Sequence, residues 1–188
     1  MSRTDTSDNG YHLGQHRLRP GKTQPWQTDI NVPFIVRGPG IPAGSTTAAI
    51  AGNYDLAPTW LAIATAVPDP GAEEIDGVSL LPLLHSPSAA TPSWKRTFSL
   101  QEGWWVPWKL QPNGTAPVYT GLRTIDPEKG LDTLYVEFAD GGSMFFDLKL
   151  DPFQTTNLAA SLDRPSKAAL AQALAAVRTC RGAGCPGH

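Results

Sequence analysis

The sequence has few charged residues and no long apolar run, and each shortage excludes a class of protein. Charged residues make up 17% of the 188 residues and the net charge is −2. This balance argues against a nucleic-acid-binding surface and against a polybasic membrane-binding surface. No apolar run approaches the ~20 residues that cross a bilayer, so no membrane span is expected. The first seven residues are nearly all polar and are not expected to be a signal peptide.

Cysteine is also scarce, with only Cys180 and Cys185. Two of the four residues between them are glycine, so a disulfide could close this short loop and would indicate an oxidising compartment. A pair of free thiols is the alternative. Two thiols without a further Cys or His pair argue against a zinc site. Asn113 begins a glycosylation sequon, which has meaning only in a secreted eukaryotic protein.

Apolar patterns predict an α/β arrangement in the first half of the chain. The run 32–37 is bounded by polar residues and by Gly38-Pro39-Gly40, which is typical of a buried strand. Asp55 provides a helix-start signal. The apolar face of the helix that follows has spacings of four, three and four, and consists of Leu56, Trp60, Ile63 and Val67. Residues 68–93 are expected to cross the surface with one packed turn.

The second half has the pattern of a small antiparallel sheet with one helix. Alternating side chains over 133–138 predict a half-exposed strand. The turn residues Asp140-Gly141-Gly142 lead to a partner strand over 144–148. Residues 119–124 are a candidate third strand. A final helix is expected over 165–178, with one apolar face made by Leu170, Leu174 and Val177.

Asp8 and Asn9 are the first candidates for chemistry. They place a carboxylate and an amide oxygen side by side, and hard cations such as calcium prefer such oxygen ligands. Gly10 follows and lets the backbone turn sharply. Asp-Asn-Gly is also an ordinary turn sequence, so these three residues alone favour a turn over a metal site.

A longer series of motifs changes that interpretation. The segments are Ser-Asp-Asn-Gly-Tyr-His-Leu-Gly-Gln-His (7–16), Pro-Gly-Lys (20–22), Asp-Ile-Asn-Val-Pro (29–33), Val-Arg-Gly-Pro-Gly-Ile (36–41), Asn-Tyr-Asp-Leu-Ala-Pro-Thr (53–59), Asp-Gly-Val-Ser-Leu-Leu-Pro-Leu-Leu (76–84), Phe-Asp-Leu (146–148), Asp151-Pro152, Asn157-Leu158 and the cysteine pair. In order and spacing the series resembles the sulfatase family. The resemblance is strongest to the branch of N-acetylglucosamine-6-sulfatases and plant- and microbe-type arylsulfatases.

The resemblance implies an α/β fold in two parts. Residues 1–96 would be the C-terminal remainder of an alkaline-phosphatase-like domain, in which helices enclose a sheet. Residues 97–188 would be a small C-terminal α+β subdomain, an antiparallel sheet with a C-terminal helix. The resemblance and the cysteine pair together suggest a secreted, lysosomal or periplasmic protein.

The resemblance also implies a function, which is hydrolysis of sulfate esters of a small molecule or a glycan. In the family, a formylglycine hydrate attacks the ester while a calcium ion and basic side chains balance the charge. Asp8 and Asn9 match the family's second pair of metal ligands. Lys22 matches a lysine that contacts the sulfate. His12 and His16 flank the same loop and are candidates for substrate contact, with surface histidines as the alternative.

The sequence lacks other parts of such a site. The family's Cys/Ser-x-Pro/Ala-x-Arg motif, which becomes the formylglycine, is absent, as are the upstream acidic ligands. The apolar strand that normally leads into Asp-Asn-Gly is replaced by polar residues 1–7, which would leave Asp8 and Asn9 on an unanchored end. Because calcium takes about six to eight oxygens, the chain is expected to be a truncated sulfatase that binds calcium weakly and is inactive alone.

Two other functions compete with this one. The first is a non-catalytic glycan-binding module, in which Trp104, Trp105 and Trp108 form a platform for sugar rings; packing between subdomains is the other explanation of these aromatics. The second is a phosphatase or phosphodiesterase on the same fold. It ranks last, because such enzymes usually draw their metal ligands from Asp and His clusters.

Overall fold

The computed structural model describes residues 2–67, 75–90, 94, 96, 98–103 and 119–185. Contacts divide the chain into two compact units. Unit 1 comprises Met1–Thr6, Phe34–Ser99 and Thr179–His188, and unit 2 comprises Ser7–Pro33 and Leu100–Arg178. The domain boundary expected between residues 96 and 97 stays a prediction. Trp104, Trp105, Trp108 and Asn113 lie outside the described residues.

Unit 1 begins with a two-stranded antiparallel sheet. Strand β1 (Arg3–Asp5) pairs with β2 (Ile35–Arg37), and Thr4 lies opposite Val36. The strand expected over 32–37 is thus confirmed in part, but its predicted burial is wrong, since Ile35 is 63% exposed. The N-terminal segment, expected to be unanchored, is paired through β1. A ribbon of two short strands has no second layer of its own, which leaves its apolar side chains exposed.

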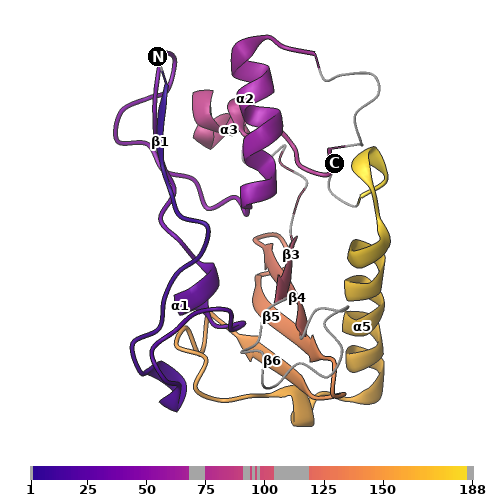
Figure 1. Ribbon diagram of the computed structural model, residues 1–188. Helices are drawn as coiled ribbons and strands as arrows, with labels where there is room; N and C mark the ends of the chain where they lie inside the picture. The colour runs from indigo at the N-terminus through magenta and orange to yellow at the C-terminus, as the bar shows by residue number, and fades with distance from the viewer. Residues whose placement is uncertain are drawn as a thin grey trace. The chain divides into compact units, whose positions relative to one another are not determined.

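A 3-10 turn, η2 (Asn53–Asp55), leads into helix α2 (Leu56–Ala64). Helix α3 (Leu81–His85) lies beside α2, and α4 (Pro87–Ala90) follows it (Figure 1). Leu80 and Leu83 are each 3% exposed, which confirms the packed turn expected in this segment.

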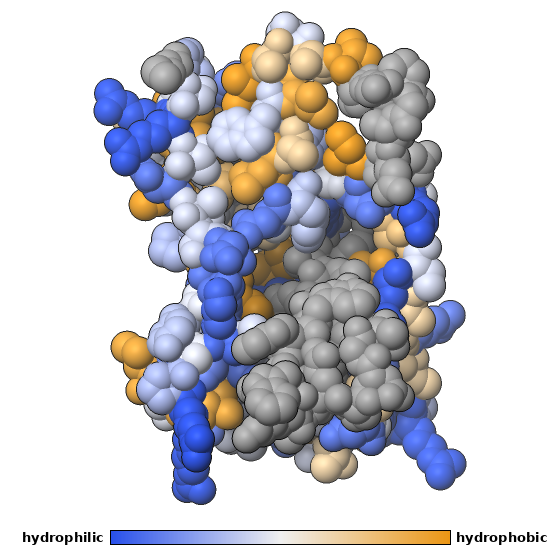
Figure 2. Space-filling model, in the orientation of Figure 1, coloured by the Kyte–Doolittle hydropathy of each residue, from blue (hydrophilic) through white to orange (hydrophobic). Residues whose placement is uncertain are grey.

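The apolar face predicted for α2 is partly exposed to solvent. Trp60 is 41% and Ile63 37% exposed, and hydrophobic surface gathers over α2 in Figure 2. The buried positions are instead the polar pair Asp55 and Thr59, one helical turn apart. The Thr59 hydroxyl donates to the Asp55 carbonyl (2.6 Å) and accepts the Leu80 N–H (2.8 Å). Hydrogen bonds therefore decide which side of this helix faces inward.

Asp55 is fully buried and organises unit 1. Its carboxylate accepts the N–H groups of Gly52 (2.9 Å) and Val78 (2.8 Å) and pairs with the guanidinium of Arg96 (2.6 Å). It makes no capping bond to α2, although the sequence predicted it as the helix cap. The Arg96 guanidinium also lies 5.1 Å from the ring centroid of Tyr54, which adds a cation–π contact.

A disulfide closes a short loop near the C-terminus, in unit 1. Cys180 and Cys185 form the predicted disulfide. The loop that it encloses contains the 3-10 turn η6 (Gly182–Gly184), and the Gly182 N–H donates to the Asp76 carboxylate (2.7 Å).

Unit 2 is built on an antiparallel sheet in the order β3-β4-β5-β6 (Figure 1). The strands are β3 (Phe98–Gly103), β4 (Tyr119–Asp126), β5 (Leu131–Phe138) and β6 (Ser143–Asp147). The last three were predicted and are confirmed, whereas β3 was not predicted. The half-exposed character expected for β5 is wrong, because Leu134, Tyr135 and Val136 are at most 1% exposed. Both faces of this central strand are therefore covered.

The predicted C-terminal helix is confirmed as α5 (Arg164–Thr179), and it buries Leu174 and Val177. Asp163 precedes the helix and its carboxylate accepts the Ser166 N–H (2.7 Å), the geometry of an N-terminal cap. Within the described ranges, none of the helices combines the length and the apolar character needed to span a bilayer.

Replacing Asp55 with Asn tests the buried ion pair of unit 1. Asp55→Asn should lower the free energy of unfolding by about 3 kcal/mol, because it leaves the Arg96 charge buried without its counter-ion. Urea unfolding measures the loss. The matched control, Arg3→Ala, breaks the exposed Arg3–Asp5 pair and should cost less than about 1 kcal/mol. Equal losses in the two variants would contradict this assignment.

The Asp163 cap predicts a pH dependence. Hydrogen bonds from Ser166 lower the pKa of Asp163 below the ordinary 3.8. The stabilisation that this cap gives the folded state is therefore present above the ordinary pKa and disappears as pH falls through the folded-state pKa. Asp163→Ala should lower the melting temperature at neutral pH, and the gap from the parent should close in strong acid. Asp163→Asn, which caps without titrating, should lose little at neutral pH. A gap that is the same in acid and at neutral pH would exclude the cap.

Candidate functional site

The segment 7–33 of unit 2 folds back on itself. His12 and Gly21 form an antiparallel bridge through two backbone hydrogen bonds, with N–O distances of 2.9 and 3.0 Å. The 3-10 turn η1 (Gln15–Arg17) lies between them, and both His16 and Arg17 have positive φ angles. The bridge places Lys22, one residue after Gly21, near the start of the segment.

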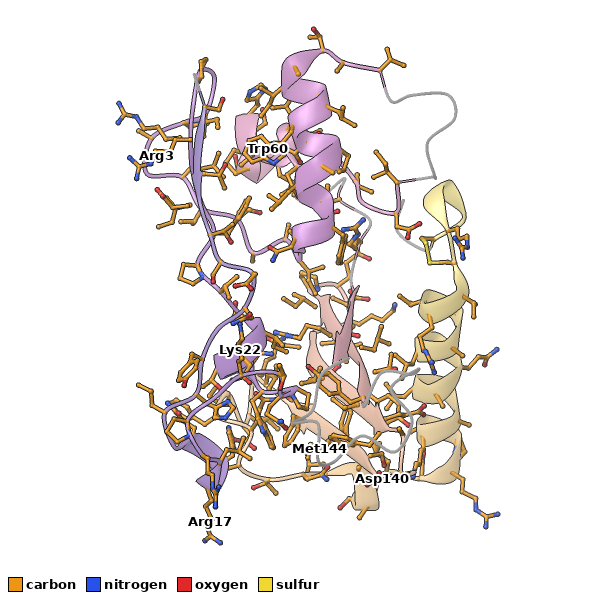
Figure 3. The ribbon with its side chains drawn as sticks, viewed as in Figure 1. Arg3, Arg17, Lys22, Trp60, Asp140 and Met144 are labelled. Atoms are coloured by element: carbon orange, nitrogen blue, oxygen red, sulfur yellow. A yellow bond between two sulfur atoms is a disulfide. The ribbon has the colours of Figure 1, made fainter. Side chains whose placement is uncertain are left out.

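Asn9 and Lys22 meet at this closed end. The Lys22 ammonium donates to the side-chain oxygen of Asn9 over 3.0 Å, across 13 residues of sequence. Figure 3 shows Lys22 beside the short helix α1 (Gln27–Ile30). Asp8 is exposed and accepts a hydrogen bond from Ser7 (3.4 Å). The structure therefore brings Asn9 and Lys22 together, and Asp8 precedes Asn9 in the chain.

His12 differs from this group, because its side chain is buried. It is 3% exposed, and its Nδ1 donates to the carboxylate oxygens of Asp29 at 2.8 and 3.0 Å. The substrate contact predicted for His12 gains no support from this geometry. The ring instead fastens the loop to α1, and a catalytic role stays a prediction.

His16 is half-buried and stacks on Trp26, with ring centroids 3.8 Å apart and planes 10° from parallel. Burial lowers the pKa of His16, while the nearby Asp151 carboxylate acts in the opposite direction. Trp26 in turn packs on Phe146 of the sheet (5.5 Å between centroids). His16 is thus tied to the sheet through an aromatic contact, and its predicted contact with substrate also stays a prediction.

Sequence reasoning missed Asp29, which lies in α1 and is 2% exposed. Besides His12, its carboxylate accepts the Gln24 N–H (2.9 Å) and the Thr28 hydroxyl (3.3 Å). Its backbone carbonyl accepts the Gly10 N–H (2.6 Å). The available signal was an acidic residue in the segment Asp-Ile-Asn-Val-Pro, which the family resemblance included without giving the aspartate a role.

The sheet of unit 2 holds α1 in place. Trp26 and Ile30 pack on its core cluster, which consists of Tyr119, Leu134, Val136, Phe146 and Leu148. The Gln27 N–H donates to the side chain of Gln154 (2.7 Å), which is itself 2% exposed. Burial, with a smaller contribution from the Asp29 charge, raises the pKa of Tyr119 to about 12. The candidate site therefore depends on residues more than a hundred positions away in the sequence.

Gly10 is required by a close approach between two backbones. A Cβ at this position would lie 2.0 Å from the Thr28 carbonyl oxygen. The φ angle of Gly10 is not positive, so the expected sharp turn is not the reason for the glycine. Asn9 keeps its place because the next residue can lie directly against α1.

The arrangement places a positive charge and oxygen ligands together at an exposed end of the segment. Asp8 and Asn9 each supply an oxygen of the kind that hard cations take. Among the described residues, no cluster of three or more His, Cys, Asp or Glu could hold a metal ion. Asp8 and Asn9 thus stay candidate metal ligands, and Lys22 donates a hydrogen bond to the second of them.

Gly10→Ala tests the close approach. The added methyl group overlaps the backbone of Thr28, so we expect a loss of about 1–3 kcal/mol in the free energy of unfolding and separation of Asn9 from Lys22. Urea unfolding and side-chain NMR signals of both residues measure the two effects. Gly184→Ala is the matched control, since nothing lies within 4 Å of its added Cβ. An unchanged Asn9–Lys22 contact in Gly10→Ala would refute the steric argument.

Comparison with known proteins identifies relatives of this chain. The family model "Sulfatase" matches residues 6–66, a range that contains Asp8, Asn9 and Lys22. The chain is 33% identical over 201 residues to the N-acetylglucosamine-6-sulfatase of Homo sapiens, in an alignment that covers 96% of this chain and 35% of that protein.

Two solved structures are similar to the chain at 26% identity. One is a protein in complex with its substrate D-glucosamine-2-N,6-O-disulfate (TM-score 0.71; 93% of this chain, 33% of that chain). The other is the phosphonate monoester hydrolase of Agrobacterium radiobacter (TM-score 0.74; 92% of this chain, 34% of that chain). The chain spans about a third of the length of these proteins.

These similarities confirm the predicted fold class, the C-terminal part of an alkaline-phosphatase-like sheet-and-helix domain with a small antiparallel sheet and a C-terminal helix. Sequence motifs, family model and structural neighbours all lead to the same assignment. The chain belongs to the sulfatase family.

Proposed function

We propose that this chain carries part of a sulfate-ester hydrolase site, in which Asp8 and Asn9 are calcium ligands and Lys22 contacts the sulfate group. The observation that carries the proposal is the 3.0 Å contact between the Lys22 ammonium and the Asn9 side-chain oxygen. It joins two residues that the family motif assigns to one site. Membership of the sulfatase family supports the reaction class.

The ligand chemistry of Asp8 and Asn9 fits calcium. A carboxylate and an amide oxygen are hard ligands, and both belong to residues on an exposed or half-exposed stretch of the loop. A bound calcium ion would stabilise negative charge on the sulfate oxygens as a Lewis acid. Since calcium takes about six to eight oxygens, two ligands predict weak binding by residues 1–188.

Lys22 supplies a compact positive charge with three donors. Negative charge develops on the bridging oxygen as a sulfate ester breaks, and an ammonium beside that oxygen would stabilise it and assist its departure. We propose a sulfated small molecule or glycan as the substrate class. The structural relative that binds a disulfated glucosamine is consistent with this class.

Residues 1–188 are proposed to have no turnover by themselves. No Cys/Ser-x-Pro/Ala-x-Arg sequence, which carries the nucleophile of the family, occurs within them. Incubation with a fluorogenic aryl sulfate and calcium should therefore release no product above a blank. Release that is abolished by Lys22→Met would show that the chain has an active centre of its own.

The similarity to a phosphonate monoester hydrolase favours a second candidate, hydrolysis of phosphonate or phosphate esters. Phosphate and sulfate are tetrahedral oxyanions, and a lysine can bind either of them in the same manner. An experiment must therefore distinguish sulfate-ester hydrolysis from phosphonate- or phosphate-ester hydrolysis. The tryptophans proposed for a glycan-binding module lie outside the described residues, so that alternative stays a prediction.

NMR titration of the labelled chain tests the site directly. Calcium should shift the signals of Asp8 and Asn9, with an affinity of roughly millimolar or weaker. Inorganic sulfate should shift the Lys22 ammonium signals, and Lys22→Met should abolish the sulfate response near Asn9. The matched control is Lys167→Met, which removes an exposed lysine of α5 in the same unit and should leave both responses unchanged.

Titration with methylphosphonate separates the two candidate reactions. A stronger response to sulfate supports a sulfatase site, and a stronger response to methylphosphonate supports the second candidate. If sulfate shifts Lys22 and Lys167 equally, the anion binds only by general charge attraction and the proposed site is wrong.

A further inference from the structure

We propose that Asp29 is a positioning residue, which holds Asn9 and Lys22 at the separation that the site needs. This inference rests on the proposed function of those two residues. Asp29 does not touch either side chain. It is hydrogen-bonded instead to Gly10, one residue after Asn9, and to Gln24, two residues after Lys22.

The first connection leads to Asn9. The carbonyl of Asp29 accepts the Gly10 N–H over 2.6 Å. Gly10 lies so close to Thr28 that no side chain fits between them. Asn9 is therefore one residue away from a point at which the backbone is fixed against α1.

The second connection leads to Lys22 from the preceding residue. The Asp29 carboxylate holds the ring of His12 at 2.8 and 3.0 Å. The backbone of His12 makes a hydrogen bond to Gly21 in each direction. Gly21 immediately precedes Lys22, so the buried His12–Asp29 pair fixes the backbone on this side of the lysine.

The third connection leads to Lys22 from the following residues. Thr23 has φ +79°, a conformation that a β-branched residue adopts only under strain. Such strain persists only where neighbouring contacts hold it. Here the next residue, Gln24, donates its N–H to Asp29 (2.9 Å), and the Thr23 hydroxyl bonds to the Lys22 carbonyl. Asp29 therefore helps to hold the turn that directs Lys22 back toward Asn9.

A buried carboxylate can also serve stability alone, and Asp55 provides that comparison. Both aspartates are at most 2% exposed, and each accepts backbone N–H groups. The contacts of Asp55 lie in unit 1, whereas those of Asp29 lie on both sides of the Asn9–Lys22 contact. Replacing either aspartate is expected to lower the stability of the protein. Only the replacement of Asp29 is expected to separate Asn9 from Lys22.

Asp29→Asn is the primary test, with Asp55→Asn as the matched control. Asparagine keeps the size of Asp29 but has one acceptor oxygen instead of two and no charge, so it can no longer accept from both the His12 Nδ1–H and the Gln24 N–H through separate oxygens. We expect the NMR contact between Lys22 and Asn9 to disappear and the sulfate affinity at Lys22 to fall by about tenfold or more. Asp55→Asn should keep both, when the two variants are compared under conditions where each is fully folded.

Glycine at position 23 provides a rescue that a purely structural role would not predict. Glycine adopts φ +79° without strain. Thr23→Gly in the Asp29→Asn background should therefore restore part of the Lys22–Asn9 contact and of the sulfate affinity. If it restores neither while the protein is folded, Asp29 does not act by holding this turn.

A second variant covers the case in which Asp29→Asn does not fold. His12→Phe keeps a flat ring but removes the Nδ1 donor, and it should weaken the Lys22–Asn9 contact in the same direction. The contact is measured without any anion, so the two proposals can fail separately. Absence of a sulfate response in the parent refutes the proposed function. An intact contact in folded Asp29→Asn or His12→Phe refutes the positioning role.

Discussion

A carboxylate removed from water must have its acceptor oxygens satisfied by the protein. In each compact unit, this constraint determines the local arrangement. The Asp29 carboxylate accepts hydrogen bonds from His12, Gln24 and Thr28, and the Asp55 carboxylate accepts them from Gly52, Val78 and Arg96. Hydrogen bonds to the two carboxylates therefore connect segments that are separate in the sequence.

The candidate site joins this polar centre to an apolar foundation. Trp26 and Ile30 pack into the core of the sheet on either side of Asp29 in the sequence. Hydrophobic contacts with the sheet therefore hold the short helix α1 in place. Its polar side makes hydrogen bonds to the loop that carries Asn9 and Lys22. A helix of four residues would not form alone. Its stability comes from the sheet, and the site inherits its position from the same contact.

The exposed side of unit 1 has a different character. Trp60, Ile63 and Ile35 present apolar surface to solvent, although the spacing along α2 is that of a core-facing helix. The polar face with Asp55 and Thr59 is buried instead, because its hydrogen-bond partners Val78, Leu80 and Arg96 lie on that side of the helix. Amphipathic spacing shows which residues share one face of a helix, but not whether that face is buried.

The sequence by itself determined the local elements, the disulfide and the family. Alternation, turn residues and helical spacing depend on neighbours along the chain, which is why β4, β5, β6 and α5 were predicted correctly. Tertiary structure decided the burial of β5, the outward face of α2 and the role of Asp29. Each of these depends on a partner distant in sequence, such as Phe146 beside Trp26 or Arg96 beside Asp55, and local patterns carry no information about such partners.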